Sequence, residues 1–138
     1  MTQPVPTTIT SLRDAINTGN AANVAACFAD DYSAIVPMHP SRNFVGSEMV
    51  QKNWTAIFGQ ISGLRARVLR HAVNGDEIWS EWEMVGTGPG DAPALLRGPV
   101  IWTEFEARIA SARFYLEPVT ERPDSAASTS VSQDGTDS

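Results

Sequence analysis

The sequence is poor in the residues that build disulfides and metal sites. It contains one cysteine, Cys27, and two histidines, His39 and His71, among 138 residues. A single cysteine cannot form an intrachain disulfide, and the set is too small for a zinc site made of cysteine or histidine ligands. The sequence therefore predicts no metal site.

Basic residues are also scarce. Lysine and arginine number 10 against 16 aspartate and glutamate residues, which gives a net charge of -6. Binding to nucleic acid or to anionic lipid needs a basic surface, so we expect neither kind of partner. No apolar run approaches the roughly 20 residues of a membrane span, and residues 1–10 lack the pattern of a signal peptide. We expect a cytoplasmic protein.

The chain is long enough for one domain, with 42% hydrophobic and 19% charged residues, as is usual for globular proteins. Residues 1–8 contain two prolines and predict a flexible arm. Residues 120–138 are rich in serine and aspartate and contain almost nothing apolar, which predicts a disordered tail. The folded domain is therefore expected at 9–119.

The first half of that domain has helical patterns. Ile9, Leu12 and Ile16 share one helical face, and Gly19 is placed to end that helix. Asn20 can cap a second helix that continues to residue 28. A short strand over 32–38 and a third helix over 47–60 are expected to follow.

The second half has the pattern of strands. Residues 64–73 and 77–87 flank Asn74-Gly75, a strong signal for a tight hairpin. Further strands are expected over 94–105 and 108–119. Helices followed by a run of antiparallel strands predict an α+β fold, with helices packed on one face of a curled sheet.

This order of elements resembles the SnoaL-like family of the nuclear transport factor 2-like, or ketosteroid isomerase-like, superfamily. The stretches that carry the resemblance are 28–32 (FADDY), 43–46 (NFVG), 74–76 (NGD), 79–83 (WSEWE) and 113–117 (RFYLE). The resemblance implies a cone-shaped α+β barrel. In such a cone, three N-terminal helices pack on a strongly bent, mostly antiparallel sheet around an apolar cavity. The resemblance also implies Asp-Gly at the turn before the last strand, where this chain has Glu106-Ala107, so an alanine is expected in a strained left-handed position.

The catalytic carboxylates of related enzymes have no counterpart here. Ketosteroid isomerases place a base aspartate just before a proline, where this chain has Val36, and an oxyanion-hole aspartate where it has Trp102. Limonene epoxide hydrolases use an Arg-x-Asp pair, which aligns with Trp82 and Met84, and a last-strand aspartate that aligns with Phe114. The resemblance therefore implies the fold without the usual catalytic groups.

Strand alternation predicts which side chains face the cavity and which face outward. The residues expected to bind a substrate are Val36, Met38, Trp54, Ser80, Trp82, Met84, Trp102 and Phe114. Trp79 and Tyr115 are expected on the outer face, where large aromatics are typical of a subunit interface, so a homodimer is predicted. Outward-facing Glu81, Glu83 and Glu117 are expected mainly to form cross-strand ion pairs.

Two polar residues in the loop after the first strand are the catalytic candidates. His39 is placed near the expected cavity mouth, where its imidazole could act as a general base. Arg42 could bind an anionic or carbonyl oxygen, or instead pair with Asp30 or Asp31 on the surface. His71 and Ser80 are expected to be cross-strand neighbours joined by a hydrogen bond rather than a catalytic pair.

Three functions fit these residues. The first is a cofactor-independent cyclase, isomerase or lyase that acts on a small apolar metabolite, with His39 as base and Arg42, Ser80 or a water stabilising an oxyanion. The second is a non-catalytic binder of such a metabolite, favoured by the missing carboxylates. The third is a dimeric assembly module that uses the outer face. The activities usual in the resembled family favour the enzyme over the other two functions.

Overall fold

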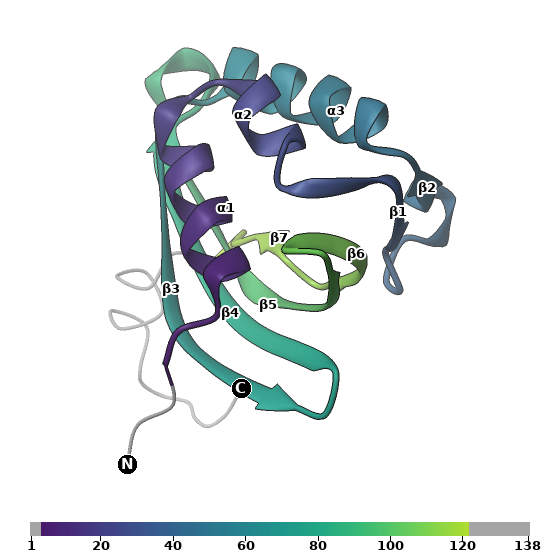
Figure 1. Ribbon diagram of the computed structural model, residues 1–138. Helices are drawn as coiled ribbons and strands as arrows, with labels where there is room; N and C mark the ends of the chain where they lie inside the picture. Colours follow the sequence, from purple (N-terminus) through teal and green to yellow (C-terminus); the bar gives the residue numbers. More distant parts are fainter. Residues whose placement is uncertain (1–3, 122–138) are drawn as a thin grey trace.

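The computed structural model describes residues 4–121, which form helices followed by a long sheet (Figure 1). Most of the predicted tail and the start of the predicted arm lie outside these residues. The elements are α1 (Thr7–Thr18), α2 (Ala21–Ala25), β1 (Phe28–Ile35), η1 (Pro40–Arg42), β2 (Phe44–Val45), α3 (Ser47–Gln60), β3 (Ser62–Asn74), β4 (Glu77–Thr87), η2 (Pro89–Asp91), β5 (Pro93–Phe105), β6 (Arg108–Phe114) and β7 (Glu117–Pro118).

The strands form one strongly curled sheet in the order β2-β1-β6-β5-β4-β3, with β7 paired to β5. All pairs are antiparallel except β1 with β6. The helices lie over the concave side of the sheet, and the sheet does not close on itself (Figure 1). The predicted α+β fold with a bent, mostly antiparallel sheet is confirmed.

The helices are positioned by their apolar faces and their caps. Ile9, Leu12 and Ile16 of α1 are buried, and Gly19 ends the helix in the left-handed conformation, with φ 73°. The side chain of Asn20 accepts hydrogen bonds from the first turn of α2, as expected for an N-cap. In α3 the buried residues are Val50 and Trp54. No helix within residues 4–121 is both long and apolar enough to cross a membrane.

The second helix and first strand differ from the prediction. The helix ends at Ala25 instead of residue 28, and β1 begins at Phe28 instead of Tyr32. Pairing with β6 is the reason: the N–H of Ile109 donates to the Cys27 carbonyl at 2.9 Å, and Phe28 is the register partner of Ile109. These contacts come from residues some 80 positions away, so local periodicity does not reveal them.

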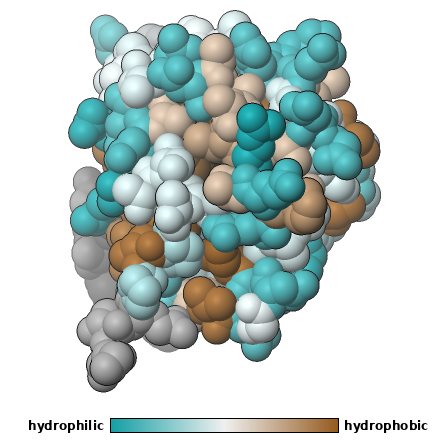
Figure 2. Space-filling view, viewed as in Figure 1, coloured by the Kyte–Doolittle hydropathy of each residue, from teal (hydrophilic) through white to brown (hydrophobic). Residues whose placement is uncertain are grey.

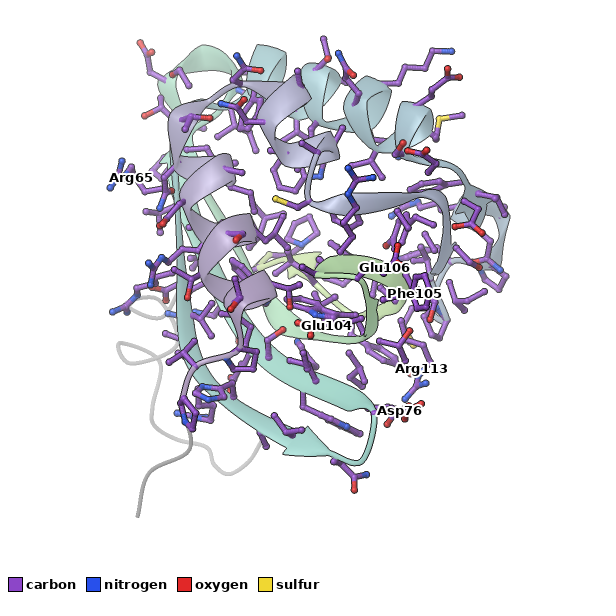
Figure 3. All side chains as sticks on the ribbon, in the orientation of Figure 1. Arg65, Asp76, Glu104, Phe105, Glu106 and Arg113 are labelled. Carbon is purple, nitrogen blue, oxygen red and sulfur yellow. The ribbon has the colours of Figure 1, made fainter. Side chains whose placement is uncertain are left out.

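The tight turns are where the sequence places them. Asn74 pairs with Glu77 around Gly75, which has φ 63°. At the β5–β6 turn Glu106 and Ala107 both have positive φ, 51° and 65°, as a two-residue type I′ loop requires. Figure 3 shows Glu104, Phe105 and Glu106 together at this end of the hairpin. The predicted left-handed position at Ala107 is confirmed.

Candidate functional site

A narrow apolar cavity lies between the helices and the inner face of the sheet. Its volume is about 20 Å³, close to the space that a single water molecule needs. Among residues 4–121, no charged side chain lines it. The lining residues are Leu12, Ile16, Phe28, Tyr32, Trp54, Trp82, Met84, Val100, Trp102, Ala112, Phe114 and Leu116.

Strand alternation brings the large side chains of the sheet into this interior. Ser80, Trp82 and Met84 of β4 are all buried, whereas Trp79 is 41% exposed on the outer face, so the predicted phase of β4 is confirmed. The rings of Trp82 and Trp102 lie 6.3 Å apart at a tilt of 43°. Aromatic packing therefore fills most of the interior and leaves little open space.

Ser80 holds the Trp82 ring in place. Its hydroxyl donates to the carbonyl of Val100 at 2.8 Å and accepts from the indole N–H of Trp82 at 2.8 Å. The predicted hydrogen bond between Ser80 and His71 is therefore wrong, although the two residues are register partners across β3 and β4. Because the Ser80 hydroxyl is already bonded to two groups, it is a structural element of the cavity wall.

The structure brings together five of the predicted substrate-binding residues and leaves three outside the lining. Those in the lining are Trp54, Trp82, Met84, Trp102 and Phe114. Ser80 lies directly behind Trp82. Val36 is half-buried in the loop after β1, and Met38 is 66% exposed. The part of each residue in binding stays a prediction.

His39 is not one of the residues that line the cavity. Its Nε2 lies 3.2 Å from Oε1 of Glu117, the residue after cavity-lining Leu116, and both side chains of the pair are half-exposed. A carboxylate only accepts hydrogen bonds, so Nε2 carries the proton and, in the neutral imidazole, Nδ1 is left as the acceptor. The outward-facing Glu117 thus orients the imidazole, a partnership that strand alternation alone does not reveal.

Arg42 is the other catalytic candidate, and it lies at the end of η1 with an exposed side chain. It makes no ion pair with any residue in the part of the chain that the structure describes. Of its predicted partners, Asp30 lies 3.8 Å from Arg108 instead. The structure does not bring Arg42 to the cavity, so its role also stays a prediction.

Tyr32 is a cavity residue that the sequence analysis did not single out. It is 2% exposed, and its ring packs edge-on against Phe28 and Phe44, with centroids 4.6 and 5.8 Å away. Burial raises the pKa of its hydroxyl, which therefore stays protonated. The signal that could have placed it inside is alternation with the buried Ala34, because both residues lie in the predicted strand over 32–38.

A second missed feature is a chain of polar side chains at the start of α1. Trp102 donates its indole N–H to the hydroxyl of buried Thr8 at 3.0 Å, and that hydroxyl donates to the carboxylate of Glu104. A threonine in an expected flexible arm gives no sequence signal for this contact. Trp102 is thus anchored to the first helix.

The outer face of the sheet carries a row of alternating charges. Arg67, Glu83, Arg97 and Glu117 are consecutive register partners on β3, β4, β5 and β7. Glu83 accepts from Arg67 at 2.8 Å and lies 2.9 Å from Arg97, and these hydrogen bonds, that of Arg67 first, lower the pKa of Glu83. The cross-strand ion pairs expected for Glu81 and Glu83 are confirmed.

Charged groups therefore surround the cavity without entering it. Among residues 4–121, no group of three or more histidine, cysteine, aspartate or glutamate side chains is placed to hold a metal ion. On the face drawn in Figure 2, exposed hydrophobic side chains form small patches separated by hydrophilic ones. The cavity is thus apolar, and the charged side chains of the described residues lie outside it.

Several solved structures share this fold at low sequence identity. A hypothetical protein with a ketosteroid isomerase-like fold from Catenulispora acidiphila, in complex with trimethylamine, is 17% identical with a TM-score of 0.71, over 81% of this chain and 87% of that one. A candidate polyketide cyclase from Sinorhizobium meliloti is 21% identical with a TM-score of 0.63, over 82% and 95%. An LEH-like epoxide hydrolase from M. tuberculosis is 14% identical with a TM-score of 0.67, over 81% of each chain.

Sequence comparison extends the structural likeness to a family. Among curated proteins, none matches this chain. A sequence profile of the SnoaL-like domain matches residues 9–112, which span α1 to β6. Because this match covers most of the chain, the protein belongs to the SnoaL-like domain family.

Proposed function

We propose that this protein binds an uncharged, apolar small molecule inside the cone. The observation that carries the proposal is the lining, to which the described part of the chain contributes aromatic and aliphatic side chains and no charged group. Burial of a charged ligand among such groups is costly unless the charge is paired, whereas apolar surface is stabilised there. Aromatic walls with few polar atoms are typical of sites for small organic ligands.

Binding needs the interior to open. Ligand pockets usually measure roughly 300–1,000 Å³, whereas this cavity measures about 20 Å³. Trp54 lies on α3 and packs against Phe58 at a centroid distance of 5.4 Å, and half-buried Phe114 lies at the end of β6. We propose that rotation of these side chains makes room, since side-chain rearrangement on binding is common.

The relatives support a small-molecule role at the level of the fold. The neighbour from Catenulispora acidiphila was solved with trimethylamine, and others are described as a candidate polyketide cyclase and an epoxide hydrolase. The shared fold does not determine which ligand binds, because ligand choice depends on the side chains of each site. The argument for this chain therefore rests on its own lining.

The four tryptophans allow a direct test with NMR. Trp54, Trp82 and Trp102 line the cavity, whereas Trp79 lies on the outer face and serves as an internal control. We expect titration with cyclohexanone to shift the three interior indole N–H signals and to leave that of Trp79 unchanged. No shift at the interior signals, or a shift of Trp79 alone, would contradict binding inside the cone.

A second candidate is acid–base catalysis from the edge of the cavity. The observation that favours it is the pair of His39 and Glu117, in which the carboxylate of Glu117 holds the imidazole. In such a reaction His39 Nδ1 would take a proton from the carbon beside a ligand carbonyl, and the electron pair would move onto the oxygen as an enolate. Arg42 is the predicted partner of that oxygen.

Proton exchange distinguishes catalysis from binding alone. If His39 is a base, the protein accelerates exchange of the α-hydrogens of cyclohexanone in D₂O, and His39→Gln abolishes the acceleration. Glu117→Gln should reduce it by a smaller factor, because the imidazole remains but is no longer held. Interior binding with no faster exchange would support the non-catalytic function.

A further inference from the structure

Two polar groups of the cavity lining have no hydrogen-bond partner among the described residues. The indole N–H groups of Trp82 and Trp102 are bonded to Ser80 and Thr8. The hydroxyl of Tyr32 and the indole N–H of Trp54 make no hydrogen bond within residues 4–121, although both residues are at least nine-tenths buried. Buried polar groups are nearly always paired, so each unpaired one requires an explanation.

Both unpaired groups are donors. An indole N–H can only donate, and a phenol donates through its O–H. The rings of Phe28 and Phe44 pack against the Tyr32 ring, and neither side chain offers a hydrogen-bond acceptor atom. The cause of its raised pKa is burial alone, which agrees with a hydroxyl that lacks a partner.

The complement of two unused donors is an acceptor atom on the ligand. We propose that Tyr32 is the specificity-determining residue of this site, and that it and Trp54 donate hydrogen bonds to an oxygen of an otherwise apolar, uncharged ligand such as a ketone, an ester or an ether. This inference rests on the proposed binding function and adds the chemical class of the ligand. The cavity volume of about 20 Å³ already accommodates one such atom before any ring moves.

Size discriminates poorly among apolar ligands, but an unmet hydrogen bond discriminates well. A hydrocarbon of the same shape would leave both donors unpaired, whereas a ketone would satisfy them. Net hydrogen-bond contributions predict that the wild-type protein binds cyclohexanone about 2- to 10-fold more tightly than methylenecyclohexane, which has the same shape without the oxygen.

Substitution of Tyr32 by phenylalanine tests the proposal, because only the hydroxyl is removed. The measured quantity is the ratio of the affinity for cyclohexanone to that for methylenecyclohexane. We expect Tyr32→Phe to lower this ratio toward 1 and Trp54→Phe to lower it partly. The matched control is Tyr115→Phe at the only other tyrosine, which does not line the cavity, and it should leave the preference unchanged. Affinities are measured from the interior indole signals or by calorimetry.

Stability gives a second measurement that needs no ligand. Removal of an unpaired buried hydroxyl should leave the unfolding midpoint of Tyr32→Phe equal to or above that of the wild type. A midpoint clearly below that of Tyr115→Phe would show that the hydroxyl has a structural partner and would overturn the proposal.

The outcomes separate this proposal from the one on which it rests. If both probes bind inside and Tyr32→Phe leaves their ratio unchanged, the role of Tyr32 is wrong while interior binding stands. If the wild-type protein binds the two probes inside with equal affinity, the proposed ligand class with an oxygen acceptor is wrong, while interior binding again stands. If neither probe shifts the interior signals, both proposals fail.

Discussion

The indole N–H of Trp102 donates a 3.0 Å hydrogen bond to the hydroxyl of Thr8, and both side chains are buried. Thr8 belongs to the first turn of α1, and its own proton goes to the carboxylate of Glu104 at the end of β5. This chain of three side chains joins the helix to the sheet at a residue that lines the cavity. The position of α1 and the orientation of Trp102 therefore depend on each other.

Thr8→Val should destabilise the protein. Valine keeps the shape of threonine but cannot accept from Trp102, which leaves a buried N–H unpaired at a cost of about 1–3 kcal/mol. Chemical denaturation measures the loss, and Thr8→Ser, which keeps the hydroxyl, should restore most of it. Thr7→Val at the exposed neighbour is the control and should change stability by less than about 0.5 kcal/mol. Equal effects at both positions would contradict this role of Thr8.

Glu83→Gln should weaken the outer face in a pH-dependent way. Folding lowers the pKa of Glu83, so its ionised form adds stability above pH 4.5, its ordinary pKa, and that contribution is lost as the pH falls toward the lower folded value. We expect the variant to be less stable than the wild type by about 0.5–1 kcal/mol at pH 7. The difference should shrink below pH 4.5.

Urea denaturation of both proteins between pH 7 and 3 measures this difference. Glu106→Gln is the matched control, because Glu106 is exposed and makes no ion pair within residues 4–121. A gap between Glu83→Gln and the wild type that stays constant with pH would mean that the loss comes from packing instead of from the charge of Glu83.

Ala107→Gly should stabilise the β5–β6 turn. Ala107 has φ 65°, a conformation that costs an L-residue about 1–2 kcal/mol and glycine nothing. Part of the gain is offset because glycine makes the unfolded chain more flexible, so we expect a net gain of about 0.5–1 kcal/mol. Ala110→Gly in β6 should instead destabilise the protein. Thermal unfolding distinguishes the two signs, and a loss of stability in Ala107→Gly would refute the strain.

The sequence predicts well those features that depend on neighbouring residues. The caps at Gly19 and Asn20, the turn at Gly75 and the inward phase of Trp82 each follow from local chemistry or from the two-residue period of a strand. The left-handed Ala107 follows instead from the family resemblance, which implies Asp-Gly at that turn. These local features suffice to order the elements and to place the aromatic residues inside.

Features that depend on distant partners could not be predicted in the same way. The start of β1 at Phe28 is set by β6, and the buried position of Thr8 is set by Trp102. The cavity volume depends on how the tryptophan and phenylalanine rings tilt against one another, which no sequence period encodes. The pairing of His39 with Glu117 brings together residues 78 positions apart for the same reason.

Trp79 should hold two copies of this chain together through the outer face of the sheet. Its side chain is 41% exposed beside buried Ile101, its register partner, and its outward-facing neighbours on β4, Glu77 and Glu81, pair with Arg113 and Arg70. An exposed aromatic among alternating charges is suited to a self-complementary contact. We expect light scattering at micromolar concentration to give a dimer, and Trp79→Glu to give a folded monomer. Phe105→Glu, at an exposed hairpin end, should remain dimeric, and a monomeric wild type would refute the interface.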